Sequence, residues 1–178
     1  YKDRVMDFKL MKNFAYNTSQ FYSSERWALT GEAGAFLDPF YSPGTDFIAL
    51  GNTWISDLIC RDLMGEDIKM RTMIYDLTHR ELYNGWINLY KNMYGTFGKT
   101  QVMLMKIIWD WASYWAIPNV MFMNGGYTDI NLLKQFSSST DNIGRRFSTL
   151  NERMQELFRD WSEKEVHPLQ AIPDRYCN

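Results

Sequence analysis

The residues best suited to chemistry gather in the stretch 27–56, which reads WALTGEAGAFLDPFYSPGTDFIALGNTWIS. A strand-like apolar run meets a Gly-Glu-Ala-Gly turn at 31–34, and a second turn at 38–44 leads into an amphipathic segment. This order predicts a strand, a tight loop and the N-terminus of a helix, with glycines that allow close approach. Backbone N–H groups and the positive end of the helix dipole then face whatever lies above the loop, which suits an anion or an electron-rich cofactor edge.

The bulk composition excludes several function classes. With 178 residues the chain has room for one domain with a real core. A net charge of -2 without a basic stripe argues against a nucleic-acid partner. Cys60 and Cys177 form no CxxC pair, which fits a reducing compartment. The most apolar stretch, 102–117, is too short to span a membrane and is interrupted by Lys106 and Asp110. We therefore expect a cytoplasmic protein without a membrane partner.

The first part of the chain carries the only strand-like patterns. Residues 1–22 mix aromatic and polar side chains in rough alternation, which is compatible with short strands around a turn. We expect a further strand that ends near Thr30, followed by a loop through Tyr41. A helix should begin between Pro43 and Asp46, with its N-terminus facing an open groove.

Helical periodicity accounts for most residues after position 44. Segment 45–62 is predicted to be a helix with one apolar face, formed by Phe47, Ile48, Gly51, Trp54, Ile55, Leu58 and Ile59. Segment 66–94 is predicted to be one long helix with an apolar stripe of Met70, Met73, Ile74, Leu77, Leu82, Trp86, Tyr90 and Met93.

Three further helical segments follow. Segment 100–116 is apolar almost all the way round, which predicts a central buried helix that ends at Pro118. A short helical piece is expected at 132–136, and the polar run 137–141 predicts a break with a new N-cap. The clearest amphipathic stripe lies at 143–161, and the tail beyond it is expected to be a loop. The fold class is therefore mainly α with a small N-terminal β element.

Residues 31–44, GEAGAFLDPFYSPG, resemble the second flavin-contact motif of FAD-dependent monooxygenases, and especially of flavin-dependent halogenases. Those families share a glycine-acidic-alanine start, an Asp-Pro, and a turn of a small residue and glycine that feeds a helix. The resemblance implies that Glu32 hydrogen-bonds the ribityl chain of FAD and that Pro43 and Gly44 lie against the flavin pyrimidine edge. The alternative for Glu32 is a cap of the turn. The implied cofactor-binding residues are Gly31, Glu32, Ala33, Asp38, Pro39, Ser42, Pro43 and Gly44.

The sequence departs from the family pattern at three positions. Glu32 stands where Asp is usual, and the extra methylene shifts the carboxylate. Pro43 has no N–H to give at the turn where halogenases hold their halide. Tyr41 stands where the tryptophan-directed branch carries Glu, so the acid assistance of that branch has no counterpart. These departures favour a monooxygenase-like oxidoreductase over a halogenase.

Two motifs of these families do not occur in this sequence. They are the dinucleotide fingerprint GxGxxG and the lysine-bearing motif of halogenases. Because the chain begins at Tyr1 rather than Met, we expect a missing N-terminal half that carries the fingerprint. Residues 1–44 would then end an FAD-binding region and 45–178 would form a helical C-terminal region of an FAD-binding α/β oxidoreductase. A flavin reductase and a small organic substrate are the other expected partners.

Aromatic residues make up 16% of the chain, and two interpretations compete for them. The favoured one places Trp109, Trp111, Tyr114 and Trp115 in a buried core, and Tyr41 equally fits a packing role. The alternative is a hydrophobic substrate pocket that includes Tyr41, Trp109, Tyr114 and Trp115, since in the related families the helices after the flavin motif often cover the substrate side.

No catalytic residue is identified from the sequence. His79 and His167 are too few and too far from a Cys pair for a zinc site, and His79 is predicted to be solvated or hydrogen-bonded. The serines lack a GxSxG context. The leading hypothesis is the C-terminal portion of an FAD-dependent oxidoreductase acting on an organic substrate. The alternative is a non-catalytic helical binding module that retains the turn.

Overall fold

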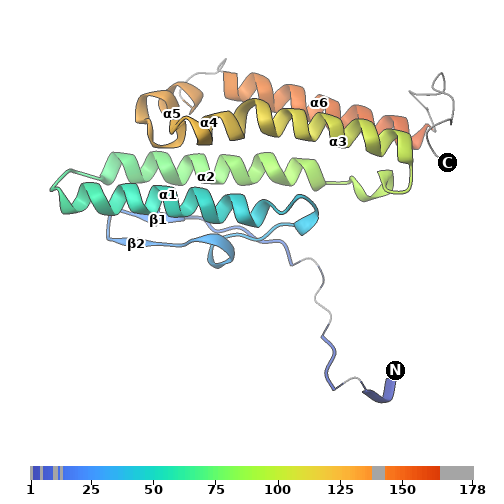
Figure 1. Ribbon diagram of the computed structural model, residues 1–178, viewed down its shortest axis with the longest axis horizontal. Coiled ribbons are helices and arrows are strands. Elements are labelled where there is room, and N and C mark those ends of the chain that lie inside the picture. Colours follow the sequence, from blue (N-terminus) through green and yellow to red (C-terminus); the bar gives the residue numbers. More distant parts are fainter. Residues whose placement is uncertain (1, 5, 10–11, 13, 138–142, 165–178) are drawn as a thin grey trace.

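The computed structural model describes residues 2–4, 6–9, 12, 14–137 and 143–164. In this part of the chain the protein is mainly helical and has one two-stranded antiparallel sheet, in agreement with the mainly α fold with a small β element that the sequence predicts. Figure 1 shows α2 between α1 and the α3–α6 pair, with the strands against the α1–α2 side. The elements are β1 (Tyr22–Ser23), β2 (Trp27–Ala28), α1 (Pro43–Leu63), α2 (Lys69–Tyr90), α3 (Thr100–Tyr114), α4 (Val120–Met123), α5 (Ile130–Ser137) and α6 (Ile143–Glu163).

The β element is a short hairpin near the start of the chain. Tyr22 pairs with Ala28, and the Leu29 N–H extends the pairing by donating to the Phe21 carbonyl at 2.8 Å. The strand predicted to end near Thr30 therefore ends close to that position. Residues 1–22 contribute less than expected, because within their described part a 3₁₀ helix and an isolated bridge accompany the single strand β1.

Two short 3₁₀ helices, Gly31–Ala33 and Pro39–Tyr41, shape the predicted loop. Asp38 caps the second one by accepting a backbone N–H at 2.9 Å. Ser42 then adopts a left-handed φ of 57°, and α1 begins at Pro43. Proline suits this first helical position because it fixes φ and its missing N–H would have had no partner within the helix. The predicted helix start is confirmed.

The core beneath the hairpin is built from aromatic rings around a histidine. His79 is 0% exposed, and its Nδ1 lies 2.7 Å from the Tyr22 hydroxyl. The Phe21 ring stacks on the imidazole with the ring centres 3.8 Å apart. Burial lowers the pKa of His79 to about 4. Of the two environments predicted for His79, solvated or hydrogen-bonded, the structure shows the hydrogen-bonded one.

The apolar stripe predicted for helix α2 is buried only in part: Tyr90 and Met93 are buried, and Ile74, Leu82 and Trp86 pack against the core. Met70, Met73 and Leu77 of the predicted stripe are exposed, while Tyr75 and Asp76 are buried. The polar face can be buried because its groups are bonded: Asp76 accepts a backbone N–H of the hairpin at 2.6 Å. The helix is also shorter than expected, since it spans Lys69–Tyr90.

Helix α3 is not the centrally buried helix that its composition predicts. Its exposed apolar residues are Leu104, Ile108 and Trp111, and Trp115 just beyond its end is exposed as well. The inward face instead carries Val102, Lys106 and Asp110. These three positions are four residues apart, so they lie on one side of the helix. The two charged residues neutralise each other, which allows that side to be buried.

The prediction that this helix ends at Pro118 is also wrong. A π-helical turn, Trp115–Asn119, contains Pro118 and connects α3 directly to α4. Proline removes one backbone donor and its ring conflicts with a regular α-helical carbonyl. A wider π turn changes the local hydrogen-bond register and so carries the helix past the proline.

The last two helices agree with the periodicity. The expected helical piece at 132–136 lies in α5, and the stripe at 143–161 lies in α6. Most of the polar break at 137–141 and the whole tail from His167 lie outside the described residues. Within the described part of the chain, every helix is too short or too polar to cross a membrane.

Candidate functional site

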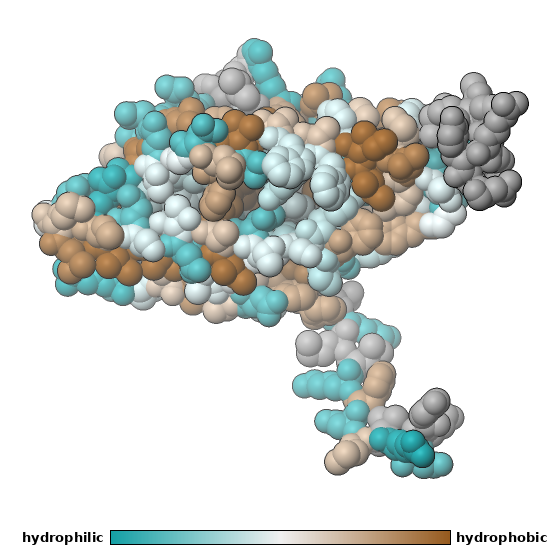
Figure 2. Space-filling model, in the orientation of Figure 1, coloured by the Kyte–Doolittle hydropathy of each residue, from teal (hydrophilic) through white to brown (hydrophobic). Residues whose placement is uncertain are grey.

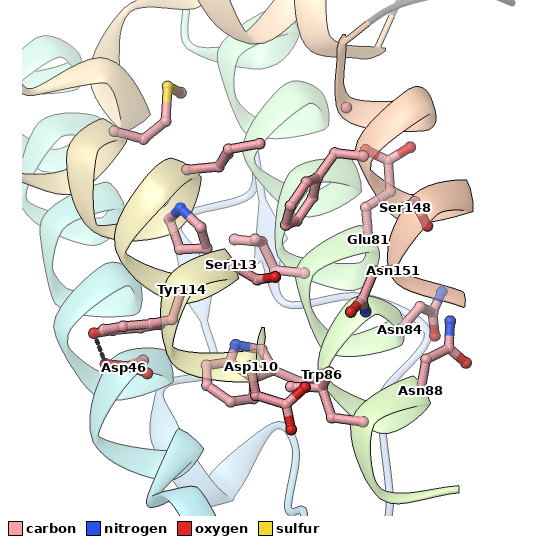
Figure 3. Close-up of a pocket in the computed structure, with 18 of the residues that line it drawn as sticks. Asp46, Glu81, Asn84, Trp86, Asn88, Asp110, Ser113, Tyr114, Ser148 and Asn151 are labelled. Atoms are coloured by element: carbon pink, nitrogen blue, oxygen red, sulfur yellow. Dashed lines mark hydrogen bonds between the residues drawn. The ribbon is translucent and has the colours of Figure 1, made fainter. Parts of the chain in front are cut away.

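A cavity of about 820 Å³ opens between the start of α1 and helices α2, α3 and α6. Figure 3 shows side chains from these helices converging on it. Further walls come from the π turn, α4 and α5. A cavity of this volume accommodates a drug-sized organic ligand.

The surface of the cavity is mostly apolar, and many of its side chains are aromatic. The aromatic lining residues are Phe40, Tyr41, Trp86, Trp111, Tyr114, Trp115, Tyr127, Phe136 and Phe147. The ring of Tyr114 lies 6.0 Å from that of Trp86 and 6.0 Å from that of Trp115, centre to centre. Polar groups are interspersed, and those labelled in Figure 3 include Asp46, Glu81, Asn84, Asn88, Ser113, Ser148 and Asn151.

Asp46 brings a carboxylate to the cavity from the first turn of α1. The Tyr114 hydroxyl donates a hydrogen bond to its Oδ1 at 3.1 Å (Figure 3). Burial raises the pKa of the Asp46 carboxyl, and the hydrogen bond from Tyr114 opposes that shift. The pair joins the start of α1 to the end of α3, so these elements are held together at the cavity.

A second carboxylate, Asp110, sits beside the cavity in a buried ion pair with Lys106. Lys106 is 1% exposed and Asp110 is 5% exposed. The Tyr41 hydroxyl donates to Asp110 Oδ2 at 2.9 Å, and Lys106 Nζ lies 5.7 Å from the centre of the Tyr41 ring. Burial lowers the pKa of Lys106, while the charge of Asp110 acts in the opposite direction.

The ion pair continues into a network that reaches α6. Gln155 Nε2 donates to Asp110 Oδ1 at 2.7 Å and to Asn151 Oδ1 at 3.2 Å. The Trp109 indole N–H donates to the same Asn151 oxygen at 2.9 Å. Tyr41 in the turn, α3 and α6 are therefore connected by buried and partly buried hydrogen bonds, which fixes three walls of the cavity relative to one another.

The sequence predicts a substrate pocket of four aromatic residues, and three of these four line the cavity. Tyr41, Tyr114 and Trp115 line the cavity together. Trp109 does not line it and packs instead against a separate small core around Phe158. The buried core position is wrong for Trp111 and Trp115, which are each more than half exposed.

Sequence reasoning missed the polar residues of this region. Asp46 and Asp110 each look like an ordinary helix-surface residue in the pattern. A usable signal existed for Lys106 and Asp110, because two opposite charges four residues apart interrupt the most apolar segment of the chain. Such a pair can be buried together, whereas either charge alone could not. No comparable local signal marked Asp46, Gln155 or their partners.

Two glycines of the turn 31–44, Gly31 and Gly34, are packed against other residues of the chain. A Cβ on Gly31 would lie 2.8 Å from the Ile48 side chain, and a Cβ on Gly34 would lie 2.6 Å from Phe21. Gly44 is different, since a Cβ there would meet nothing within 4 Å. Another molecule can therefore approach the backbone closely at Gly44, whereas Gly31 and Gly34 are needed for packing within the chain.

The other residues of the implied cofactor site are spread along the turn. Glu32 and Ala33 lie exposed in the first 3₁₀ helix, and the Glu32 side chain forms no hydrogen bond with a described residue. Asp38 and Pro39 begin the second 3₁₀ helix. Of the implied cofactor-binding residues, Ser42 lines the cavity. No three described His, Cys, Asp or Glu residues are grouped so as to hold a metal ion.

Comparison with known proteins finds a weak similarity. A protein named "Flavin-dependent halogenase chlA" from Dictyostelium discoideum is 25% identical over 115 residues, which is 64% of this chain. The match covers 19% of that protein, so the chain corresponds to about a fifth of the length of this relative. No family model and no solved structure matches the chain.

Proposed function

We propose that this chain is the C-terminal portion of a flavin-dependent oxidoreductase whose helices enclose an organic substrate. One observation carries the proposal: the turn that resembles a flavin-contact motif ends in the wall of the cavity. Tyr41 and Ser42 of that turn, and Thr45 and Asp46 of the helix it feeds, all line the cavity. A cofactor held by the turn and a ligand in the cavity would therefore be neighbours. The similarity to a protein named as a flavin-dependent halogenase supports the same class.

The exposed residues of the turn fit an FAD molecule. Glu32 presents an uncommitted carboxylate to solvent, and Gly44 leaves the backbone at the start of α1 accessible. The N-terminus of α1 adds the positive end of a helix dipole. When bound, a reduced flavin supplies electrons to molecular oxygen. The residues of this chain would orient the cofactor edge and keep the substrate in an aromatic enclosure from which bulk water is excluded.

The proposal includes partners that would complete the enzyme. An N-terminal half with the GxGxxG fingerprint would bind the FAD pyrophosphate. A flavin reductase would supply the reduced cofactor. Residues 1–44 would then belong with the FAD-binding half, and 45–178 would form the region that encloses the substrate.

Substitution of Glu32 tests the cofactor site. In the full-length protein, Glu32→Ala should weaken FAD binding by roughly 1–3 kcal/mol, because a charged hydrogen-bond partner is lost. Equilibrium dialysis with visible absorbance measures the retained FAD. Glu25→Ala, which removes another exposed carboxylate from the same part of the chain, is the matched control and should bind FAD normally. Equal FAD affinity in the wild type and the Glu32 variant would contradict this role.

Within the proposed class, Pro43 favours a monooxygenase-like reaction over halogenation. Pro43 occupies the first position of α1 and offers no N–H. Wild-type enzyme given reduced flavin, oxygen and chloride should therefore chlorinate aromatic test compounds poorly. Pro43→Ser restores the donor and should tighten chloride binding about ten- to a hundredfold, the effect of one charge-assisted hydrogen bond. Line broadening in chloride NMR measures binding, and mass spectrometry detects chlorinated products.

A second variant distinguishes the backbone N–H from the serine hydroxyl as the cause of tighter chloride binding. Pro43→Ala restores the backbone N–H without adding a hydroxyl and should match Pro43→Ser. Robust chlorination by the wild-type enzyme would show that the missing donor is unimportant, and would favour a halogenase.

A non-catalytic helical binding module is the second candidate. The observation that favours it is a set of exposed apolar residues near the corner between α1 and α2, namely Ile59, Leu63, Met64, Met70 and Met73. Figure 2 shows brown, apolar surface along the side of the molecule where α1 lies. A full-length protein that is colourless and takes up no added FAD would favour this function over the first.

A further inference from the structure

We infer that Asp46 determines ligand specificity in the cavity and selects an aromatic compound that carries a protonated amine. This inference rests on the proposed function of the cavity as a substrate site and adds the chemical class of the substrate. It follows from the position of Asp46, the charge of the lining and the nature of the walls.

Asp46 offers the cavity a carboxylate oxygen that has no hydrogen-bond partner among the described residues. Its Oδ1 receives the Tyr114 hydroxyl at 3.1 Å, and no other described residue hydrogen-bonds its carboxylate. Its Oδ2 is therefore available to a ligand. Burial raises the pKa of this carboxyl group, and the Tyr114 hydroxyl and the start of α1 act in the opposite direction. A half-buried carboxylate with one unpaired oxygen binds a hydrogen-bond donor favourably, and a cationic donor binds it most strongly.

The charges of the lining point to a cation as well. Among the described lining residues, the carboxylates belong to Asp46, Glu81, Asp110 and Glu152, and the only guanidinium belongs to Arg145. Lys106, beneath the wall, neutralises Asp110. A net negative lining remains, which disfavours an anionic ligand and attracts a cationic one.

The rest of the cavity defines the body of the ligand. The rings of Trp86 and Trp115 each lie 6.0 Å, centre to centre, from the ring of Tyr114, whose hydroxyl donates to Asp46. Rings at this spacing present faces and edges to a planar hydrocarbon, and an ammonium group near such rings gains further attraction. The volume of about 820 Å³ exceeds what a single ring fills. An extended aromatic body with the amine directed at Asp46 fits these features.

Three compounds with one body and three head groups test the inference. They are 4-phenylbenzylamine, 4-phenylbenzyl alcohol and 4-phenylphenylacetate, titrated into the 178-residue chain at neutral pH. Isothermal calorimetry measures the dissociation constants, and tryptophan fluorescence reports on the cavity because three tryptophans, Trp86, Trp111 and Trp115, line it. The amine should bind at least tenfold more tightly than the alcohol, and the carboxylate should bind most weakly.

Two variants decide whether Asp46 is the cause. Asp46→Asn keeps the size of the side chain and should abolish most of the preference for the amine over the alcohol. Glu156→Gln removes the same unit of charge from an exposed site on α6 that does not line the cavity, and should leave the preference intact. Circular dichroism and the melting temperature show whether each variant is folded.

The possible outcomes are separable from those of the flavin experiments. Equal binding of the three compounds, failure of all three to bind, or an unchanged preference in folded Asp46→Asn would overturn the inference. An equal loss of preference in Glu156→Gln would attribute the selectivity to overall charge and would overturn it too. FAD retention by the full-length protein does not depend on these results, so a flavoprotein with a different substrate class would be recognised as such.

Discussion

Lys106→Met should lower the free energy of unfolding by about 3–5 kcal/mol, the largest effect that we expect from a single substitution. Methionine preserves the length and apolar stem of lysine. The ammonium is lost, however, and Asp110 is left as an unpaired charge that is 5% exposed. Its remaining partners, Tyr41 and Gln155, donate neutral hydrogen bonds that compensate only part of the cost. Urea unfolding followed by circular dichroism measures the change.

Two companion variants test this explanation. Lys106→Met combined with Asp110→Asn removes both charges but keeps an amide oxygen for Tyr41, and should recover a large part of the lost stability. Lys164→Met breaks an exposed pair with Asp160, also four residues apart, and should change stability by less than about 1 kcal/mol. A loss of similar size in Lys106→Met and Lys164→Met would show that the buried pair has no special importance.

The second large effect concerns acid stability. The free energy of unfolding should fall by about 3 kcal/mol between pH 7 and pH 4 through His79 alone. The pKa of His79 is lowered by burial from 6.5 to about 4. As the pH falls, His79 is therefore protonated near pH 6.5 in the unfolded state but only near pH 4 in the folded state. Stability from this group is complete above the unfolded pKa and is lost progressively as the pH falls through that window.

A variant isolates this contribution from the carboxylates that also titrate in acid. His79→Gln retains a polar partner for the Tyr22 hydroxyl but cannot gain a proton. The variant should be less stable at pH 7, because the stacking on Phe21 is lost, and its stability should depend less on pH between 7 and 4. Urea unfolding at several pH values gives, for each protein, the slope of the free energy of unfolding against pH. Parallel slopes for the two proteins would contradict a lowered pKa at His79.

Local sequence was sufficient for the turn and the start of α1. Asp38 caps a turn, Ser42 takes a left-handed conformation, and Pro43 fits the first helical position. Each of these preferences acts over a few residues, so the helix start at Pro43 could be predicted without knowledge of the rest of the chain. The same holds for the existence of the long helices, whose periodicity extends over many residues.

The buried faces could not be predicted in this way. Helix α2 is covered on two sides, so the apolar residues Met70 and Met73 were a poor guide to its inward face. Helix α3 turns Lys106 and Asp110 inward because Tyr41 and Gln155, far away in the sequence, complete their hydrogen bonds. The hydropathy pattern predicts that Lys106 and Asp110 are exposed, because their hydrogen-bond partners are brought close only by folding.

The sequence by itself determined that the chain is mainly helical, that a small β element precedes the helices and that α1 starts after a turn resembling a flavin-contact motif. These features follow from short-range backbone preferences and from helical periodicity. Only the tertiary structure decided that this turn ends at a cavity, and that Asp46 and Asp110 lie along its wall. The physical reason is that the cavity exists between helices, where its lining is set by packing between segments up to about a hundred residues apart and not by the properties of any one segment.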